Sequence, residues 1–438
     1  MSLSTPPTVT PSDHTRSTTA APTAADAVRP LITSMLGPTP PVRIELWDGS
    51  AIEAENPPGT LRVRSPDALR RILWSPDELG LGRAYVAGDI DADGDLLEML
   101  KALRASARTF RLDGAATALA AARRVGALGP PLPPPPEEAR VRGRRHSARR
   151  DSQAVQHHYD VGNDFYRIVL GPAMTYSCAR YVDDSTTLVD AQAAKHELVC
   201  RKLGLHERPD SRLLDVGCGW GSMALHAAAN HGATVVGVTI SEQQAELARA
   251  RVVEAGLEDR VEIRLEDYRE LTGERFDAIS SIGMFEHVGA ARIGQYFGTL
   301  RELLGPNGRL LNHAISTVHG SKIGGRTFMG RYVFPDSELI DVGDVVHAME
   351  DVGFEVRDVE SLREHYARTL RDWIANLEAD WDRAVELAGP GRARIWRLYM
   401  AGSAVGFDDG GLNVHQVLGV VQDDDGAGGM PRTRAGWE

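Results

Sequence analysis

The chain has 438 residues, 42% of them hydrophobic and 25% charged, so it can bury sizeable cores and is not disordered throughout. Its length predicts two domains and a linker, and its net charge of -12 argues against nucleic acid as the main partner. No apolar run approaches the roughly 20 residues that span a bilayer, and three cysteines without metal or disulfide spacing fit a reducing cytoplasm.

The N-terminal third predicts a tail followed by a small domain. Residues 1–26 are rich in Ser, Thr, Pro and Ala, lack an apolar core segment, and are expected to be a disordered tail rather than a secretory signal. Residues 42–65 alternate apolar and polar side chains around Asp48-Gly49, which predicts a β-hairpin. A helix capped by Ser65 and a helical run to about Arg124 complete an expected α+β domain over residues 27–125.

Residues 126–152 open with a proline run, which is stiff and extended and therefore predicts an interdomain linker. Its second half is basic, with Arg140, Arg142, Arg144, Arg145, Arg149 and Arg150. Such a cluster is attracted to anionic lipid headgroups at about 1 kcal/mol per basic residue. On charge alone, a solvated linker that only keeps the chain soluble is an equally good interpretation.

Residues 153–425 alternate apolar, strand-like runs with helical stretches, which predicts a mostly parallel sheet covered by helices. The expected strands are residues 212–218, 234–241, 261–268, 276–283 and 308–316, and helices are expected at 242–256 and 292–305. Residues 328–401 are expected to be mainly helical, with interruptions at Pro335 and Gly353, and residues 426–438 to be a flexible tail.

A glycine loop follows the first of these strands, with Asp215, Gly217 and Gly219 ahead of a helix. Glycine is required where the backbone turns tightly and approaches a ligand. The G-x-G-x-G spacing differs from the dinucleotide fingerprint and is similar to motif I of class I S-adenosylmethionine (SAM) methyltransferases. NAD is therefore the weaker interpretation.

The next two strands end in side chains that are expected to hold the rest of this cofactor. No carboxylate ends the second strand, so Thr239 and Gln244, beside Ile240, are expected to bind the ribose hydroxyls. Asp267 and Tyr268, at the end of the third strand, are expected to hold the adenine ring.

Four further segments occur in one order along the chain: HHYDVGNDFYRIVLGPAMTYSCARY, SIGMFEHVG, LLNHAIS and HYARTLRDW. Over about residues 157–420 they resemble the family of cyclopropane-fatty-acyl-phospholipid synthases and mycolic acid cyclopropane synthases, including tuberculostearate-type fatty acyl methyltransferases. The N-terminal part resembles the longer members that act on phospholipid acyl chains. The resemblance implies an α/β fold: a class I SAM methyltransferase Rossmann-like domain with added helices, plus the small N-terminal α+β domain.

The resemblance also implies roles for individual residues. Tyr176 and Ser177 would lie beside the SAM sulfonium, no metal is implied, and five residues would surround a bicarbonate ion that acts as general base: Cys178, Glu286, His313, Ile315 through its backbone, and Tyr366. Each of these also has a plainer interpretation. Cys178 alone is more often a small buried hydrophobe, and Glu286 alone could cap a helix.

The implied reaction is methylation of the cis double bond in an oleoyl-type phospholipid chain. The resulting carbocation requires a dry pocket with aromatic faces, for which the candidates are Phe165, Tyr166, Tyr176, Phe285 and Phe328. Proton loss from the added methyl group closes a cyclopropane ring, whereas a hydride shift before proton loss gives a methylene branch, which a downstream reductase can convert to a methyl branch. We favour the methylene branch, a tuberculostearate precursor.

Two rival functions stay open: methylation of a soluble small molecule at nitrogen or oxygen, and a catalytically inactive SAM- or lipid-binding protein. The N-terminal domain is expected to serve membrane docking, substrate presentation or assembly of a homo-oligomer. The expected location is cytoplasmic, peripheral at the inner face of an anionic membrane.

Overall fold

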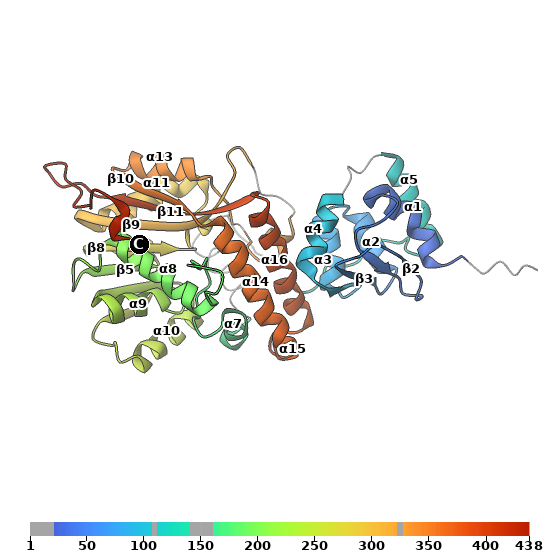
Figure 1. Cartoon of the computed structure of the whole chain (residues 1–438), viewed down its shortest axis with the longest axis horizontal. Coiled ribbons are helices and arrows are strands. Elements are labelled where there is room, and N and C mark those ends of the chain that lie inside the picture. The colour runs from blue at the N-terminus through green and yellow to red at the C-terminus, as the bar shows by residue number, and fades with distance from the viewer. Residues whose placement is uncertain are drawn as a thin grey trace, which may run out of the picture.

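The computed structural model describes residues 22–106, 112–139, 150, 161–321, 327–335 and 337–437. Its larger part is built on a seven-stranded sheet of order β10-β11-β9-β8-β5-β6-β7 (Figure 1). The strands are β5 Arg212–Val216, β6 Thr234–Thr239, β7 Val261–Leu265, β8 Phe276–Ile282, β9 Leu304–Thr317, β10 Glu355–Ser361 and β11 Leu412–Val420. The five strands expected from the sequence are confirmed as β5 to β9.

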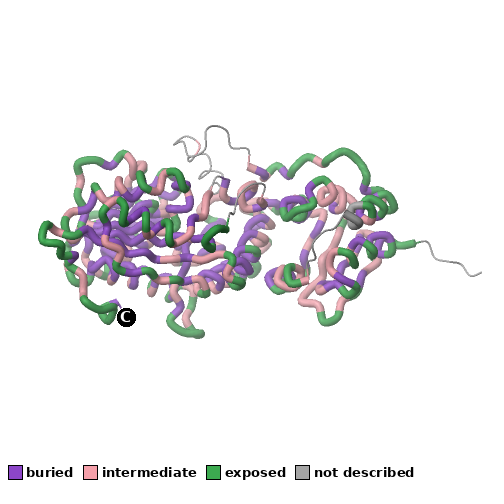
Figure 2. Tube along the Cα trace, turned by 90° about the horizontal axis from the view of Figure 1, so that it is seen from above, coloured by how far each residue is buried: buried purple, intermediate pink, exposed green. Residues whose placement is uncertain are grey.

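Helices cover both faces of this sheet because successive buried residues of a strand point to opposite sides. Leu213 packs in a core with α8, α9 and α10, whereas Leu214 packs in a second core with α11 and α13. The helices of this part are α7 Asn163–Leu170, α8 Leu188–Leu203, α9 Ser222–His231, α10 Glu242–Glu254, α11 Ile293–Glu302, α12 Phe328–Tyr332, α13 Val342–Asp351, α14 Arg363–Ala379, α15 Trp381–Ala388 and α16 Pro390–Asp408. Figure 2 shows the buried residues concentrated along the sheet.

The expectation of a mainly helical segment over 328–401 is wrong at β10. This strand pairs only with β11, antiparallel, and β11 also pairs antiparallel with β9. Along β10 only Asp358 is buried, so the strand lacks the apolar alternation that predicts a strand. The buried Asp358 carboxylate is instead paired with Lys202 at 2.8 Å and Arg434 at 2.7 Å.

The N-terminal part is α+β, with a four-stranded sheet of order β2-β1-β3-β4. Its elements are α1 Ala24–Leu36, β1 Arg43–Glu45, β2 Ala51–Ile52, β3 Gly59–Val63, α2 Asp67–Trp74, α3 Glu78–Val86, β4 Ile90–Gly94, α4 Leu96–Ser106 and α5 Leu112–Arg124. The hairpin at Asp48-Gly49 is confirmed, with Gly49 at φ +80°. The Ser65 hydroxyl accepts a hydrogen bond from the N–H of Asp67, the first helical residue.

The boundaries of the expected tails differ from the structure. Helix α1 begins at Ala24 with Thr23 as its cap, so order starts before residue 27, and residues 1–21 lie outside the described residues. At the other end, residues 426–437 are not a free tail. Trp437 is buried, and its ring centroid lies 5.9 Å from the Lys202 ammonium. Arg309 donates a hydrogen bond to the carbonyl of Gly429. The segment therefore covers the C-terminal end of α8, where Lys202 lies.

The described part of the linker packs on the N-terminal domain. Its carbonyls accept hydrogen bonds from α2, including Gly129 O from Trp74 and Pro133 O from Arg71. Near its end, the buried Glu138 carboxylate accepts two bonds of 2.8 Å from Arg83 on α3 and one of 3.2 Å from Tyr332 on α12. Glu138 therefore ties the N-terminal domain, the linker and the larger domain together. Of the six linker arginines, only Arg150 is among the described residues.

We expect Glu138→Ala to lower the free energy of unfolding by about 3 kcal/mol, because it leaves the partly buried Arg83 without its carboxylate partner. Urea unfolding measures this change, and limited proteolysis should cut the linker faster in the variant. The control is Glu386→Ala, which breaks an exposed pair with Arg383 and should cost less than about 1 kcal/mol. Equal effects of the two substitutions would contradict the coupling role of Glu138.

Candidate functional site

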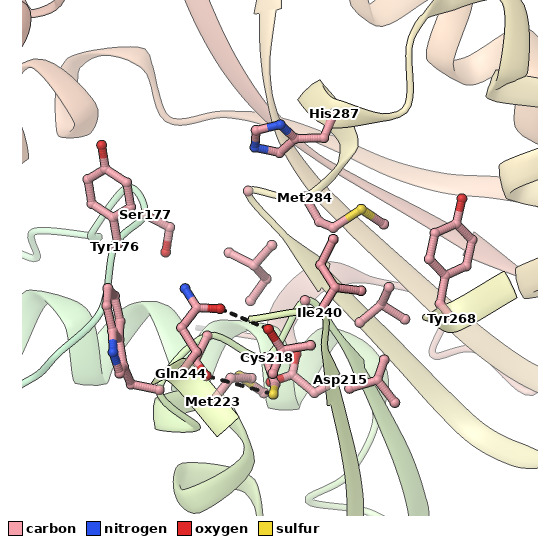
Figure 3. A pocket seen from close by; sticks show the side chains of 18 of the residues that line it. Tyr176, Ser177, Asp215, Cys218, Met223, Ile240, Gln244, Tyr268, Met284 and His287 are labelled. Atoms are coloured by element: carbon pink, nitrogen blue, oxygen red, sulfur yellow. Dashed lines mark hydrogen bonds between the residues drawn. The ribbon is translucent and has the colours of Figure 1, made fainter. Parts of the chain in front are cut away.

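A cavity of about 180 Å³ opens at the carboxyl ends of β5 to β8 (Figure 3). In a parallel sheet these ends are where the loops leave room for a ligand. All of the side chains expected to bind the cofactor line it: Tyr176, Ser177, Asp215, Gly217, Gly219, Thr239, Ile240, Gln244, Asp267 and Tyr268. The structure thus brings together residues from three separate strand ends, of β5, β6 and β7, and from the segment of Tyr176 and Ser177 that precedes α8.

The glycine loop lines this cavity, and position 217 requires a glycine. Gly217 has φ +72°, and a Cβ there would come within 2.9 Å of the Met284 side chain. Asp215, at the end of β5, is buried, and its Oδ1 accepts a 2.7 Å bond from Ser280. Burial raises the pKa of Asp215 to about 6.

Thr239 and Gln244 form a pair that presents one donor to the cavity. The Thr239 hydroxyl donates to Gln244 Oε1 at 2.9 Å, and both side chains are buried. With its oxygen engaged, the Gln244 amide turns its nitrogen toward the cavity (Figure 3). An N–H donor in place of a carboxylate at the end of β6 suits a hydroxyl oxygen as acceptor.

At the end of β7, Asp267 is engaged by a residue that the sequence analysis did not single out. Arg269 donates to both carboxylate oxygens, at 2.9 and 2.5 Å. Burial raises the pKa of Asp267, but the bonds from Arg269 outweigh it and hold the pKa below its ordinary value. The Tyr268 ring lies beside it, edge-on to Tyr296 at 5.6 Å between centroids.

Helix α8 fixes the segment that carries Tyr176 and Ser177. Gln192 donates to the Ser177 carbonyl at 2.8 Å, and the buried Lys195 ammonium donates to the Ser177 hydroxyl at 3.0 Å. Burial lowers the pKa of Lys195 to about 7. The sequence analysis missed both residues, although their spacing of three places them on one face of a helix.

A second cavity, of about 760 Å³, lies among α3, α4, α12, α14 and α16. It is larger and mostly apolar, and its N-terminal wall includes Leu81 and Leu100. The two cavities share four lining residues: Tyr176, Gly283, His287 and Pro335. They therefore meet at the ends of β8 and of the Tyr176 segment.

Three of the five expected catalytic residues, Glu286, Ile315 and Tyr366, line the second cavity. The backbone N–H of Ile315 donates to Glu286 Oε1 at 2.7 Å, while Oε2 is buried with no hydrogen-bond partner among the described residues. Burial raises the pKa of Glu286 to about 7. The carboxyl group can therefore gain or lose a proton near neutral pH.

The other two, His313 and Cys178, are buried behind the cavity wall. Burial holds the pKa of His313 well below its ordinary value, so the ring is neutral. Its Nδ1 faces the Gln416 amide nitrogen at 3.2 Å, which leaves the proton on Nε2, and within the described chain Nε2 has no partner. His313 lies two residues from Ile315 and so on the same face of β9.

The Cys178 thiol and the backbone N–H of Tyr366 both contact the carbonyl oxygen of Leu362. The Cys178 thiol lies 3.6 Å from the Leu362 oxygen, which also accepts the Tyr366 N–H at 3.1 Å. Leu362 in turn donates to Val414, the partner of Ile315 in the sheet. Burial raises the pKa of Cys178, so it stays a thiol, as a structural cysteine does.

The aromatic candidates divide in two. Tyr176 and Phe328 line the second cavity, whereas Phe165, Tyr166 and Phe285 are absent from its lining and are buried in the cores. The sequence analysis missed other rings that line it: Phe334, Tyr399 and Phe407. They come from segments that pack together only in the folded chain, and the Tyr399 hydroxyl lies 2.9 Å from that of Tyr176.

Comparisons with known proteins agree with this geometry. A family model described as mycolic acid cyclopropane synthetase matches residues 146–417. A Mycobacterium tuberculosis protein named as a probable fatty acid methyltransferase is 42% identical over 91% of this chain and 95% of its own. The tuberculostearic acid methyltransferase of that species is 33% identical (86% and 87%), and the cyclopropane-fatty-acyl-phospholipid synthase of Escherichia coli is also 33% identical (82% and 87%).

Among solved structures, the mycolic acid cyclopropane synthase CmaA1 complexed with SAH and CTAB superposes with a TM-score of 0.58. It is 35% identical, and the match covers 61% of this chain and 97% of that one. Class I SAM methyltransferases therefore share the fold of the larger domain.

The raised pKa of Glu286 predicts a pH-dependent stability. Between about 4.5 and about 7 the folded chain binds more protons than the unfolded chain, so this contribution is complete at low pH and is lost as the pH rises through 7. Between pH 5 and pH 8, we expect the unfolding free energy of the wild type to fall by roughly 2 kcal/mol more than that of Glu286→Gln, which lacks the ionisable group. Urea titrations at the two pH values measure this, with the exposed Glu302→Gln as control. If the unfolding free energies of all three proteins changed equally with pH, the pKa of the Glu286 carboxyl would not be raised.

Proposed function

The chain belongs to the mycolic acid cyclopropane synthetase family of SAM-dependent methyltransferases that act on fatty acyl lipids, and from this premise we propose its substrate and product. The substrate is the cis double bond of an oleoyl-type chain bound in a phospholipid. The product carries a methylene branch at the former double bond, a tuberculostearate precursor.

The observation that carries the proposal is the junction of the two cavities at Tyr176, Gly283 and His287. Polar side chains at the strand ends of the smaller cavity suit a nucleoside cofactor. The larger cavity suits an acyl chain because it has the greater volume and a mostly apolar lining. Methyl transfer requires the two reacting groups in contact. The junction between the two cavities meets that requirement.

SAM would supply an electrophilic methyl group, held by the residues of the smaller cavity. Gln244 would donate to a ribose hydroxyl, and Tyr268 would cover the adenine ring, while Tyr176 and Ser177 lie at the junction side. Because α8 fixes Ser177 through Gln192 and Lys195, the methyl donor would be held against one wall.

The larger cavity would exclude water and stabilise positive charge on the alkylated chain. The rings of Tyr366 and Phe407 lie 4.7 Å apart between centroids, tilted by 32°, and those of Phe334 and Tyr399 meet edge-on at 5.7 Å. Aromatic faces attract cations, most strongly where water is absent. No described residue of this lining is a nucleophilic amine or thiol that could capture the cation in place of proton loss.

The residues fit a small bound anion such as bicarbonate, which would supply the general base. Two buried polar atoms point to this fit: Glu286 Oε2 and His313 Nε2, neither with a partner in the described parts of the chain. A neutral His313 with its proton on Nε2 is a donor to an anion. With its pKa near 7, Glu286 can accept the proton that the base collects and release it to solvent.

The second cavity also supports a lipid rather than a soluble substrate. Its wall includes Arg104 from α4 and Arg331 from α12, so basic groups border an apolar interior. This distribution suits a phosphate headgroup outside and an acyl chain inside. In the part of the chain that the structure describes, no helix has the length and apolarity to cross a membrane, and we propose peripheral binding to an anionic surface, aided by the basic linker.

The same cation leads to a cyclopropane if the added methyl group loses its proton directly, whereas the methylene branch requires a hydride shift from the methylated carbon to the cationic carbon before that methyl group loses its proton. The two products are isomers, each with one CH₂ more than the substrate, so product identity depends on whether the hydride shift precedes proton loss. The relatives include both outcomes, at equal identity. Cyclopropanation is therefore the alternative within the same site.

Product analysis tests the proposal. We expect incubation of the chain with SAM and dioleoyl phospholipid to add the mass of one CH₂ to the acyl chains. Nuclear magnetic resonance of the extracted lipid should show vinylidene protons, whereas ring protons would establish the cyclopropane. Methyl transfer only to soluble amines or alcohols, with unchanged lipid, would reject a lipid substrate.

The proton-removal step has its own test. We expect Glu286→Gln and Tyr366→Phe each to lower kcat by about 10²-fold or more while SAM still raises the melting temperature. Removal of dissolved carbonate should slow the wild type, and added bicarbonate should restore it. The exposed Glu302→Gln is the control. Full activity of Glu286→Gln would contradict the assignment.

A further inference from the structure

A cluster of metal-ligating side chains lies between α8 and α9, which run side by side in Figure 1. Cys200 of α8 and His226 and His231 of α9 each place one ligand atom so that all three lie within 4.8 Å of one another. Cys200 is fully buried, and the two imidazoles are mostly buried, with 15% and 7% of their side chains exposed. None of these residues lines either cavity.

A carboxylate adjoins the two imidazoles of the cluster. Oε2 of Glu197, one helical turn before Cys200, lies 2.9 Å from His231 Nε2 and 3.3 Å from His226 Nε2. In a tetrahedral site with metal–ligand distances of 2.0 to 2.3 Å, ligand atoms lie roughly 3.3 to 3.8 Å apart. The distances from the carboxylate to the two imidazoles are already near that spacing. The thiol lies within 4.8 Å of the imidazole ligand atoms and would have to approach them and the carboxylate.

The Cys200 thiol is the second indication of a ligand. The thiols of Cys178 and Cys218 each donate to a backbone carbonyl. Among the described residues, no such bond engages Cys200, although it is equally buried. A buried thiol close to two imidazoles, with a carboxylate beside them, is a donor set that zinc favours.

We propose that Cys200, His226, His231 and Glu197 bind one zinc ion. Sulfur, two imidazole nitrogens and a carboxylate oxygen form a closed tetrahedral set of the structural type. On binding, each imidazole moves its proton from Nε2 to Nδ1, the Nε2 atoms and the Glu197 oxygen turn from each other to the metal, and the thiol releases its proton to solvent. Arg201, which donates to Glu197 Oε1 at 2.7 Å, holds the carboxylate in place.

The metal would stiffen the wall of the cofactor cavity. Helix α8 carries Gln192 and Lys195, which fix Ser177, and α9 begins directly after the glycine loop at Ser222. His196 lines the cofactor cavity and packs against His226, with 5.6 Å between ring centroids. A zinc ion joining the two helices would therefore hold the glycine loop and the Ser177 segment relative to each other.

Metal binding is measured on the full chain, purified without a histidine tag and passed over a chelating resin. We expect it to take up one zinc ion per chain and to gain roughly 5 °C in melting temperature at a hundredfold excess over Kd. Cobalt(II) in place of zinc should give the near-ultraviolet charge-transfer absorption of a cobalt–thiolate bond.

The variants Cys200→Ser and His231→Gln should each weaken zinc binding by about a hundredfold or more, and Cys200→Ser should remove the thiolate absorption. His347→Gln, on the distant helix α13, should bind as the wild type does. If a variant fails to fold, His226→Gln and the wild-type cobalt spectrum carry the test. No stoichiometric zinc, no thiolate band, or equal binding by the wild type and Cys200→Ser would overturn the proposal and leave a buried histidine–glutamate network.

Discussion

The hydrogen bond from the Ile315 backbone to the buried Glu286 carboxyl is the contact on which the proposed chemistry depends. It fixes an ionisable group at the wall of an apolar cavity and leaves the second oxygen of that group without a partner in the described chain. The strand that supplies the N–H also carries His313 on the same face. Removing water from the carboxyl raises its pKa to about 7, so under the proposed function this backbone contact would position a proton acceptor for physiological pH.

The N-terminal domain takes part in the same site. Helices α3 and α4 contribute Leu81 and Leu100 to the larger cavity, opposite α14 and α16 of the larger domain. Glu138 holds this arrangement by joining Arg83 to Tyr332 across the linker. Of the roles expected for the N-terminal domain, substrate presentation gains the most direct support, because the domain forms part of the wall that an acyl chain would touch.

The sequence predicts the cofactor cavity well because its residues directly follow strands, as Gly217 follows β5 and Asp267 follows β7. It predicts the second cavity poorly, because Phe334, Tyr399 and Leu81 meet only through tertiary packing. Strand β10 was missed since its one buried side chain is the charged Asp358. The cluster at Cys200 and His231 has no motif spacing, because its ligands come from two helices.

The central claim is that an acyl chain in the larger cavity meets the methyl donor at Tyr176 and Gly283. A crystal structure of the chain with S-adenosylhomocysteine and an oleoyl phospholipid tests it most directly. We predict density for the acyl chain among α3, α14 and α16, with its double bond beside Tyr176 and the cofactor sulfur on the other side of the junction. Acyl density on an outer surface, with the larger cavity filled by ordered water, would contradict the account.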